Sequence, residues 1–280
     1  MAFSILLFGA TSLLGFQLAN SFSYTIFPFI SPGNPSKAVR QWPELHLHDS
    51  VWLADVFSRM QPGILLYCHA VCDVPKCETS PAWAHEMNVQ QVERVLEALP
   101  VHTRLVYVSS DHVFGGDGLY HEESRTCPIS VYGRTRVEAE RLVLARPGTL
   151  VIRAGLGIGS SPDGKTGHLD WLRYRTGRKL PITIIEDEYR SVVWQRDLAL
   201  RVMQLAQSDA VGIHHILATR AVSRVELANY LIGEFEIPAT FSIESRHQQA
   251  TPHLGRVELA SVHEGELSCP LSSVLDIDFV

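Results

Sequence analysis

Tyr132 and Arg136 are the residues of this chain whose types and spacing best suit proton chemistry. On a helix, residues four apart lie one above the other on the same face, so this phenol and this positive charge would share a patch. Such a charge favours the phenolate and lowers the pKa of the tyrosine. A tyrosine that exchanges a proton near neutral pH suits acid–base chemistry on a carbonyl or an alcohol. The competing interpretation is a surface helix with a tyrosine and a solvated arginine.

A strand-like run, residues 104–110, precedes this stretch and ends in polar side chains. In parallel α/β sheets, ligands bind beyond the carboxyl ends of the strands. Ser110, followed by Asp111 and His112, therefore lies where a substrate is expected. Serine and aspartate also cap turns, which is the structural alternative.

The N-terminal segment predicts a nucleotide site. Residues 3–8 are a continuous apolar run, as in a strand buried on both faces, and residues 16–20 look helical. Strand, glycine-rich turn and helix are the context of a dinucleotide-binding motif, in which free N–H groups at the helix N-terminus bind the pyrophosphate. The alternative is a glycine turn that only packs a strand against a helix. The candidate cofactor residues in this turn are Gly9, Thr11, Ser12, Leu13, Leu14 and Gly15.

The following segment bears on the choice of cofactor. Residues 24–30 predict a second strand. In NAD-specific proteins a carboxylate at the end of this strand binds the ribose hydroxyls, and this chain has no carboxylate there. Lys37 and Arg40 come soon after and could meet a 2′-phosphate, which favours NADP over NAD. A short third strand is expected at residues 45–48, and Asp49 after it is a further candidate cofactor residue.

The rest of the chain alternates between strand and helix patterns. This rhythm predicts an α/β fold, a doubly wound parallel sheet of the Rossmann type, with a small C-terminal substrate lobe. We assign residues 1–165 to the dinucleotide-binding domain, with later segments returning to it, and residues 166–280 to a mixed α/β lobe. Further strands are expected at residues 63–69, 104–109, 150–153, 181–185 and 213–216. Further helices are expected at residues 51–60, 81–99, 168–176, 197–207 and 224–235, and the helix that carries Tyr132 should run to about residue 145.

Composition narrows the class of protein. The chain of 280 residues has a net charge of −6 and no run of lysine or arginine, which argues against a nucleic-acid partner. No apolar stretch reaches the roughly 18 residues of a membrane span, and no signal peptide is evident, so a cytoplasmic protein is expected. The five cysteines are irregularly spaced and predict neither a disulfide framework nor a metal site. The expected partner is a small-molecule substrate, and a homodimer is left open.

Four segments together resemble one enzyme family. The chain resembles the extended short-chain dehydrogenase/reductases, and within them the dTDP-4-dehydrorhamnose reductase branch of sugar nucleotide-binding proteins. That branch also includes the regulatory beta subunit of methionine adenosyltransferase. The segments are residues 109–116 (Ser-Ser-Asp-His-Val-Phe-Gly-Gly), 128–133 (Pro-Ile-Ser-Val-Tyr-Gly), 187–199 and 223–228.

The resemblance implies NAD(P) binding and hydride transfer at a carbonyl or an alcohol, possibly of a 4-keto nucleotide sugar. It implies that Tyr132 is the catalytic acid/base and that Ser110 hydrogen-bonds the substrate oxygen. Arg136 falls where the family has a lysine that also contacts the cofactor, so it is both a catalytic and a cofactor candidate. Leu156 falls where the rhamnose-pathway reductases have a tryptophan, and His112 takes the place of a tyrosine.

Three functions are compatible with these residues. The first is an NAD(P)-dependent oxidoreductase. The second is a catalytically weak NADP-binding regulatory subunit, because arginine keeps the charge of lysine but does not release a proton. The third is epimerase or dehydratase chemistry, ranked lowest because no glutamate adjoins Asp111. His69, His112 and His121 are candidates for additional acid–base groups, with a structural role as the alternative.

Overall fold

A six-stranded, all-parallel sheet forms the centre of the molecule. The computed structural model describes residues 5–276, and its main sheet has the strand order β10-β6-β4-β3-β1-β2. Neighbouring strands pair in parallel throughout. The doubly wound α/β fold expected from the sequence is confirmed. The strands are β1 (Ile5–Phe8), β2 (Ile26–Phe29), β3 (Ile64–Tyr67), β4 (Arg104–Ser110), β6 (Leu150–Ala154) and β10 (Gly212–Ile216).

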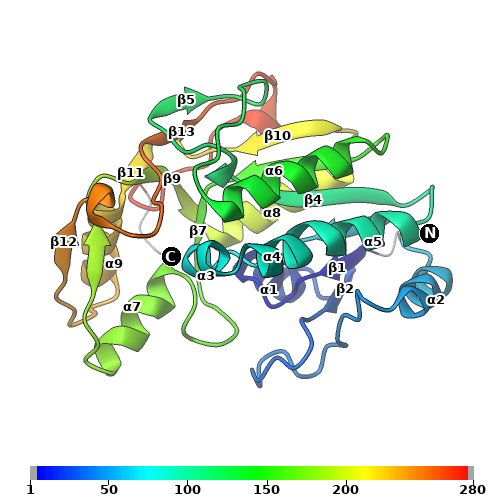
Figure 1. Cartoon of the computed structure of the whole chain (residues 1–280), viewed down its shortest axis with the longest axis horizontal. Helices are drawn as coiled ribbons and strands as arrows, with labels where there is room; N and C mark the ends of the chain where they lie inside the picture. The colour runs from blue at the N-terminus through cyan, green and yellow to red at the C-terminus, as the bar shows by residue number, and fades with distance from the viewer. Residues whose placement is uncertain (1–4, 277–280) are drawn as a thin grey trace.

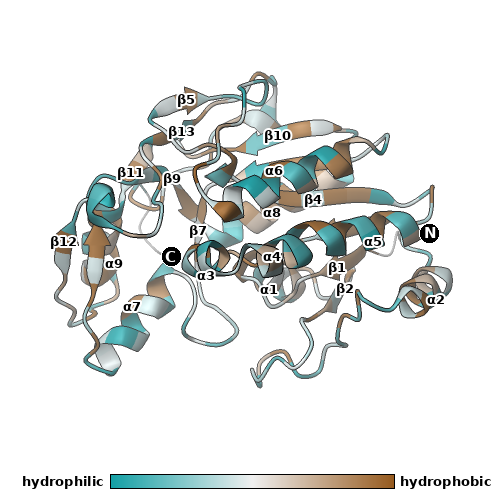
Figure 2. Ribbon diagram, viewed as in Figure 1, coloured by the Kyte–Doolittle hydropathy of each residue, from teal (hydrophilic) through white to brown (hydrophobic). Residues whose placement is uncertain are grey.

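Helices cover both faces of this sheet (Figure 1). On one face, α1 (Leu13–Ser21) packs against α8 (Gln195–Gln207). On the other face lie α2 (Ser50–Met60), α5 (Gln91–Ala98) and α6 (Val131–Leu144). Because both faces are covered, the strands are mainly apolar, as the brown colour of β1 and of the middle of β4 shows in Figure 2.

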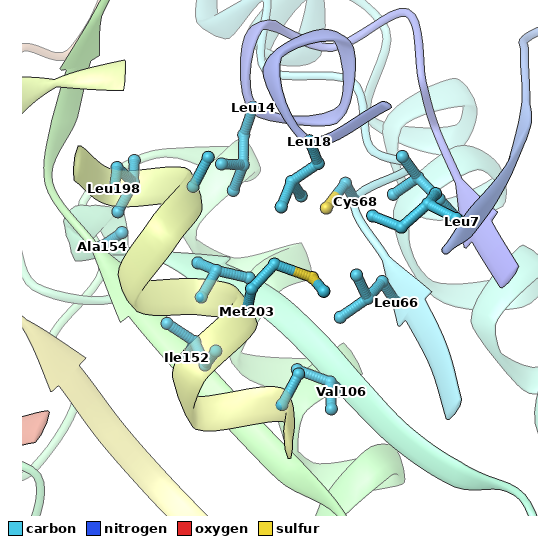
Figure 3. Packing of buried hydrophobic residues seen from close by; sticks show 14 of the residues in the cluster. Leu7, Leu14, Leu18, Leu66, Cys68, Val106, Ile152, Ala154, Leu198 and Met203 are labelled. Atoms are coloured by element: carbon cyan, nitrogen blue, oxygen red, sulfur yellow. The ribbon is translucent and has the colours of Figure 1, made fainter. Parts of the chain in front are cut away.

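Figure 3 shows the packing between the sheet and the α1–α8 face. Side chains from both helices point onto side chains of the central strands, and all of them are at most 8% exposed. This contact holds the N-terminal turn of the cofactor motif against the sheet. The labelled residues are Leu14 and Leu18 of α1, Leu198 and Met203 of α8, and Leu7, Leu66, Cys68, Val106, Ile152 and Ala154.

A second group of elements, formed by the C-terminal half, lies beside the carboxyl edge of the sheet (Figure 1). It has its own apolar core, built around Val192, Trp194 and Leu231. β10 and α8 come from the same half of the chain but belong to the main sheet and its cover. The elements of this lobe are β7 (Leu156–Ile158), α7 (His168–Gly177), β8 (Thr183–Ile185), β9 (Tyr189–Trp194), β11 (Ala221–Ser223), α9 (Arg224–Glu234) and β12 (Ser242–Glu244).

One predicted strand is wrong. Residues 45–48 form no strand; Glu44 makes only an isolated bridge with Ile30, and the Leu45 N–H donates to the Ile30 carbonyl. Leu45 and Leu47 are buried beneath α2, so their alternation with His46 and His48 reflects one-sided packing rather than strand pairing. The sixth strand of the sheet is β10 instead.

The remaining elements are short. The helix expected at residues 81–99 runs from α4 (Pro81–His85) through a π-helical turn (Glu86–Gln90) into α5, and α3 (Val74–Thr79) precedes it. A parallel pair, β5 (Gly118–Tyr120) and β13 (Val257–Leu259), was not expected. No helix within residues 5–276 is both long and apolar enough to cross a membrane.

Candidate active site

The start of α6 brings Tyr132 to the end of β4. Ser130 caps the helix by accepting a hydrogen bond of 3.0 Å from the Gly133 N–H. A β-carbon at Gly133 would lie 2.3 Å from the carbonyl oxygen of His112, so only glycine allows α6 to sit this close to the turn after β4. The sequence stretch around Tyr132 is therefore pinned against the stretch that carries Ser110.

Tyr132, Arg136 and Glu140 follow one another along a single buried face of α6. The guanidinium carbon of Arg136 lies 4.7 Å from the ring centroid of Tyr107 and 5.9 Å from that of Tyr132. Its Nη2 donates to the Val108 carbonyl, while its Nε is buried without a hydrogen-bond partner. Arg136 is only 2% exposed, so the interpretation as a solvated surface arginine is wrong.

The pKa of Tyr132 results from opposing influences. Burial raises it, the charge on Arg136 lowers it, and a hydrogen bond with Ser110 lowers it further; burial prevails, so the pKa lies above its ordinary value. The expected influence of Arg136 is present, but it does not bring the pKa of the phenol down to neutral pH. At neutral pH Tyr132 is a phenol that can donate a proton.

Ser110 is the last residue of β4 and is half-buried beside Tyr132. Its Oγ donates to Asp111 Oδ1 at 3.1 Å and accepts from the His112 N–H at 3.3 Å. The geometry brings two hydroxyl groups, those of Ser110 and Tyr132, to the same place at the carboxyl edge of the sheet. Such a pair can hold and protonate one oxygen atom of a ligand.

A buried ion-pair group joins this edge to the C-terminal lobe. Asp111, fully buried, accepts two hydrogen bonds from the Arg190 guanidinium on β9, one of them 2.8 Å long. Glu188 lies 2.9 Å from His253 Nδ1 and 3.6 Å from Arg224. Burial opposes ionisation of Glu188, but Arg224, His253 and Arg190 outweigh it and hold the pKa of this carboxyl far below its usual range.

Sequence reasoning missed Glu188, Arg190 and Arg224. The segment around Arg190 was noticed only through the family resemblance. Single charged residues of the lobe give no spacing signal, because their partners are far away in the chain.

A second buried network supports the helix face below Arg136. Arg153 on β6 binds the Glu140 carboxylate with three hydrogen bonds of 2.7 to 3.2 Å. Ser109, on the strand that carries Ser110, donates to the same carboxylate. Glu140 therefore ties α6, β4 and β6 together behind the candidate catalytic residues.

The turn after β1 has the geometry that a pyrophosphate needs. Gly9 has a φ of +95°, and a β-carbon there would lie 2.5 Å from the His69 nitrogen; one at Gly15 would lie 2.2 Å from the Gly9 carbonyl oxygen. Ser12 caps α1 by accepting from the Gly15 N–H at 3.0 Å. Within residues 5–276, the N–H groups of Leu13 and Leu14 make no hydrogen bond. Two free donors at the positive end of a helix suit an anionic group.

The hydroxyl groups of Thr11 and Ser31 lie beyond the carboxyl ends of β1 and β2, 3.1 Å apart. Ser31 was not among the predicted site residues, because a serine after a strand is usually taken for a turn residue. Lys37 and Arg40 are exposed in the loop after β2. Asp49 instead caps α2, accepting from the Trp52 N–H at 2.9 Å, so its carboxylate already has a structural role.

The three candidate histidines differ in surroundings. His69 is buried and its Nε2 lies 2.8 Å from Gln91 Oε1; burial lowers its pKa. His121 has a buried Nδ1 without a partner. His112 is the one beside Tyr132, with ring centroids 5.2 Å apart.

The family assignment follows from comparison with known proteins. Residues 3–260 match the family model described as the RmlD substrate binding domain. The chain belongs to the RmlD substrate binding domain family. This confirms the resemblance to the dTDP-4-dehydrorhamnose reductase branch.

Individual known proteins are also similar to this chain. A Streptomyces antibioticus protein named "Probable dTDP-4,6-dihydroxy-2-methyloxan-3-one 4-ketoreductase" is 35% identical over 181 residues, 58% of this chain and 56% of that protein. The "Methionine adenosyltransferase 2 subunit beta" of Xenopus tropicalis is 26% identical over 247 residues, 84% of this chain and 73% of that protein. The solved dTDP-4-dehydrorhamnose reductase from Bacillus anthracis, in complex with NADP, is 20% identical with a TM-score of 0.78, covering 92% of this chain and 90% of that one.

Proposed function

We propose that this protein is an NADP(H)-dependent reductase of a small oxo compound, and that its substrate is a keto sugar carried by a nucleotide. One observation carries the proposal: Tyr132 and Ser110 converge at the carboxyl end of β4, with the buried charge of Arg136 beneath the phenol. The relatives named as ketoreductase and dTDP-4-dehydrorhamnose reductase support the substrate class.

The cofactor assignment rests on two features of the N-terminal half. The free N–H groups of Leu13 and Leu14 would bind the pyrophosphate, within the turn that Gly9 makes possible. NAD-specific proteins have an acidic residue after the second strand, which would repel a 2′-phosphate. This chain instead has the paired, uncharged hydroxyls of Thr11 and Ser31 beyond the ends of β1 and β2. Lys37 and Arg40, exposed in the next loop, supply positive charge on that side.

The chain's own residues would handle the oxygen and its proton. Bound NADPH supplies the hydride. Ser110 holds the substrate oxygen through its hydroxyl, and Tyr132 donates the phenolic proton to that oxygen. Arg136 then stabilises the phenolate that remains, because its charge cannot leave with a proton.

Two further assignments concern the substrate-binding lobe and the cellular compartment. We place substrate recognition in the predicted lobe from residue 166 onward together with β7, which pairs with β9, and apart from α8 and β10, because Arg190 and Glu188 of that lobe face the end of β4. We place the protein in the cytoplasm, because the cysteines within residues 5–276 are free thiols, which suits a reducing compartment.

The test is NADPH oxidation in the presence of dTDP-4-keto-6-deoxyglucose. Tyr132→Phe removes only the phenolic hydroxyl, so the fold and cofactor binding should persist. We expect kcat to fall by about 10²- to 10⁴-fold, the usual contribution of a positioned proton donor. Equal turnover by the wild type and the variant would remove Tyr132 from the mechanism.

A regulatory, catalytically weak subunit is the second candidate. It is favoured by the contacts of Arg136, whose Nη2 donates to the Val108 carbonyl and whose guanidinium lies over Tyr107. The likeness to methionine adenosyltransferase 2 subunit beta supports it as well. The test is affinity capture at native concentration together with turnover: a stoichiometric protein partner and negligible reduction of keto sugars would favour this candidate over the reductase.

A further inference from the structure

His112 stands next to the proposed proton donor in a setting that a purely structural histidine does not need. Its ring meets the Tyr132 ring edge-on, with centroids 5.2 Å apart and an interplanar angle of 70°. The 3₁₀ turn Asp111–Val113 that carries it is held on one side by Ser110 Oγ and packs on the other side against Gly133. The position of the imidazole relative to Tyr132 and Ser110 is thus set by the backbone.

The two ring nitrogens of His112 have different environments. Nδ1 is buried and has no hydrogen-bond partner, whereas Nε2 is not buried to that degree and has no partner within residues 5–276 either. Buried polar atoms in native proteins nearly always have partners, so an unpaired imidazole beside a candidate active site calls for an explanation. A ligand that reaches the more accessible Nε2 gives the ring its one hydrogen-bond partner, while the buried Nδ1 stays unpaired.

The charge state of His112 follows from its surroundings. Burial lowers the pKa of His112 to about 4, and Arg190 and Arg224 act in the same direction, against the opposing charges of Asp111 and Glu188. The imidazole is therefore neutral at physiological pH. A neutral imidazole carries one N–H, and placing it on the buried Nδ1 would leave a donor without an acceptor. The Nε2–H form instead offers a donor to a ligand.

We propose that His112 is a specificity-determining residue that donates a hydrogen bond from Nε2 to an oxygen on the carbon next to the reacting carbonyl. The inference rests on the proposed reductase function. Tyr132 and Ser110 both address the reacting oxygen, so the neighbouring imidazole is left for a second oxygen of the same substrate. The substrate class is accordingly an α-hydroxy ketone rather than an isolated ketone.

The experiment compares two ketones, dTDP-4-keto-6-deoxyglucose and its 3-deoxy counterpart, which lacks the hydroxyl next to the ketone. Wild-type protein should prefer the hydroxy ketone in kcat/KM by about tenfold or more, the cost of leaving one buried donor unpaired. His112→Phe keeps the ring beside Tyr132 and should bring the two ketones to within about twofold. His112→Gln keeps a donor and should keep most of the preference.

Two outcomes would overturn the proposal. The first is an unchanged preference in His112→Phe, since a structural role of the ring would alter stability or kcat but not the ratio between the two ketones. The second outcome belongs to a binding experiment. If neither ketone is reduced, the result counts against the proposed reductase function itself, and the role of His112 is tested by binding instead. Calorimetric binding of both compounds to the NADP⁺-loaded protein then decides: identical affinity ratios in wild type and His112→Phe overturn the role of His112, and a lost ratio in the variant supports it.

Discussion

Replacing Arg136 with methionine would remove the buried positive charge next to Tyr132 while keeping an unbranched side chain. The guanidinium carbon lies 5.9 Å from the Tyr132 ring centroid. At an effective dielectric constant of about 20, a positive charge and a phenolate at that distance attract each other by about 3 kcal/mol. This corresponds to roughly 2 pKa units, by which the pKa of Tyr132 should rise in Arg136→Met.

The assay is the pH dependence of kcat/KM in both directions. In alcohol oxidation by NADP⁺ the phenolate is the base, so kcat/KM rises as the pH passes upward through the pKa of Tyr132. Because the wild-type pKa already lies above its ordinary value, a shift of about 2 units in Arg136→Met should carry that limb beyond the upper end of the assay, so that kcat/KM no longer rises within the pH range in which the wild type responds. In reduction at neutral pH, where Tyr132 is already protonated, kcat should fall by up to about 100-fold because the phenolate left behind loses its counter-charge.

Arg136→Lys is the matched control because it keeps the charge. Its pH limb should stay within about half a unit of the wild-type position, and a higher turnover than wild type would identify arginine as a damaging replacement. Thermal unfolding and NADPH binding of both variants establish that they are folded. The reasoning would be refuted if Arg136→Met bound NADPH normally and its pH limb moved by less than half a unit.

Three further changes test other parts of the structure. Asp111→Ala removes both hydrogen bonds of the buried Arg190 and leaves it only the longer, 3.9 Å ion pair with Glu188, so it should lower the free energy of unfolding, measured in urea, by about 3 kcal/mol. Ser31→Asp should shift the kcat/KM ratio from NADPH toward NADH, because a carboxylate repels a 2′-phosphate and binds a free ribose hydroxyl. Burial opposes ionisation of Glu122, but hydrogen bonds from Ser261, Val262 and His215 lower its pKa to about 2. Its stabilisation is therefore present above the unfolded pKa and disappears as the pH falls toward 2. Glu122→Gln should be less stable at pH 7 by up to about 3 kcal/mol, and urea titrations should show that deficit shrinking below pH 4.

The fold class and the main catalytic candidates could be predicted because their signals are local. A buried parallel strand is apolar along its length, so β1, β3 and β6 stand out in the sequence. The spacing of Gly9 and Gly15 is also a local signal, because a β-carbon at Gly15 would meet the carbonyl oxygen of Gly9, although the close approach of Gly9 to His69 depends on the fold. Residues four apart on a helix lie on the same face, and Tyr132 and Arg136 do so on the buried face of α6.

The one wrong strand shows where local signals fail. Leu45 and Leu47 alternate with polar residues as they would in a strand, yet they pack under α2 without a strand partner. Alternation reports burial on one side, and it does not report which backbone groups are paired. The strand that does complete the sheet, β10, lies more than 160 residues further along the chain.

The sequence by itself determined the parallel sheet, the dinucleotide turn and the pairing of Tyr132 with a positive charge, because each depends on residues close together in the chain. Only the tertiary structure decided the electrostatics of the site. Burial raises the pKa of Tyr132 despite Arg136, and Asp111 finds its partner in Arg190, 79 residues away. The same is true of His112, whose unpaired Nδ1 is a property of its surroundings. Desolvation and long-range ion pairing depend on what the folded chain places around a group, and no spacing in the sequence encodes that.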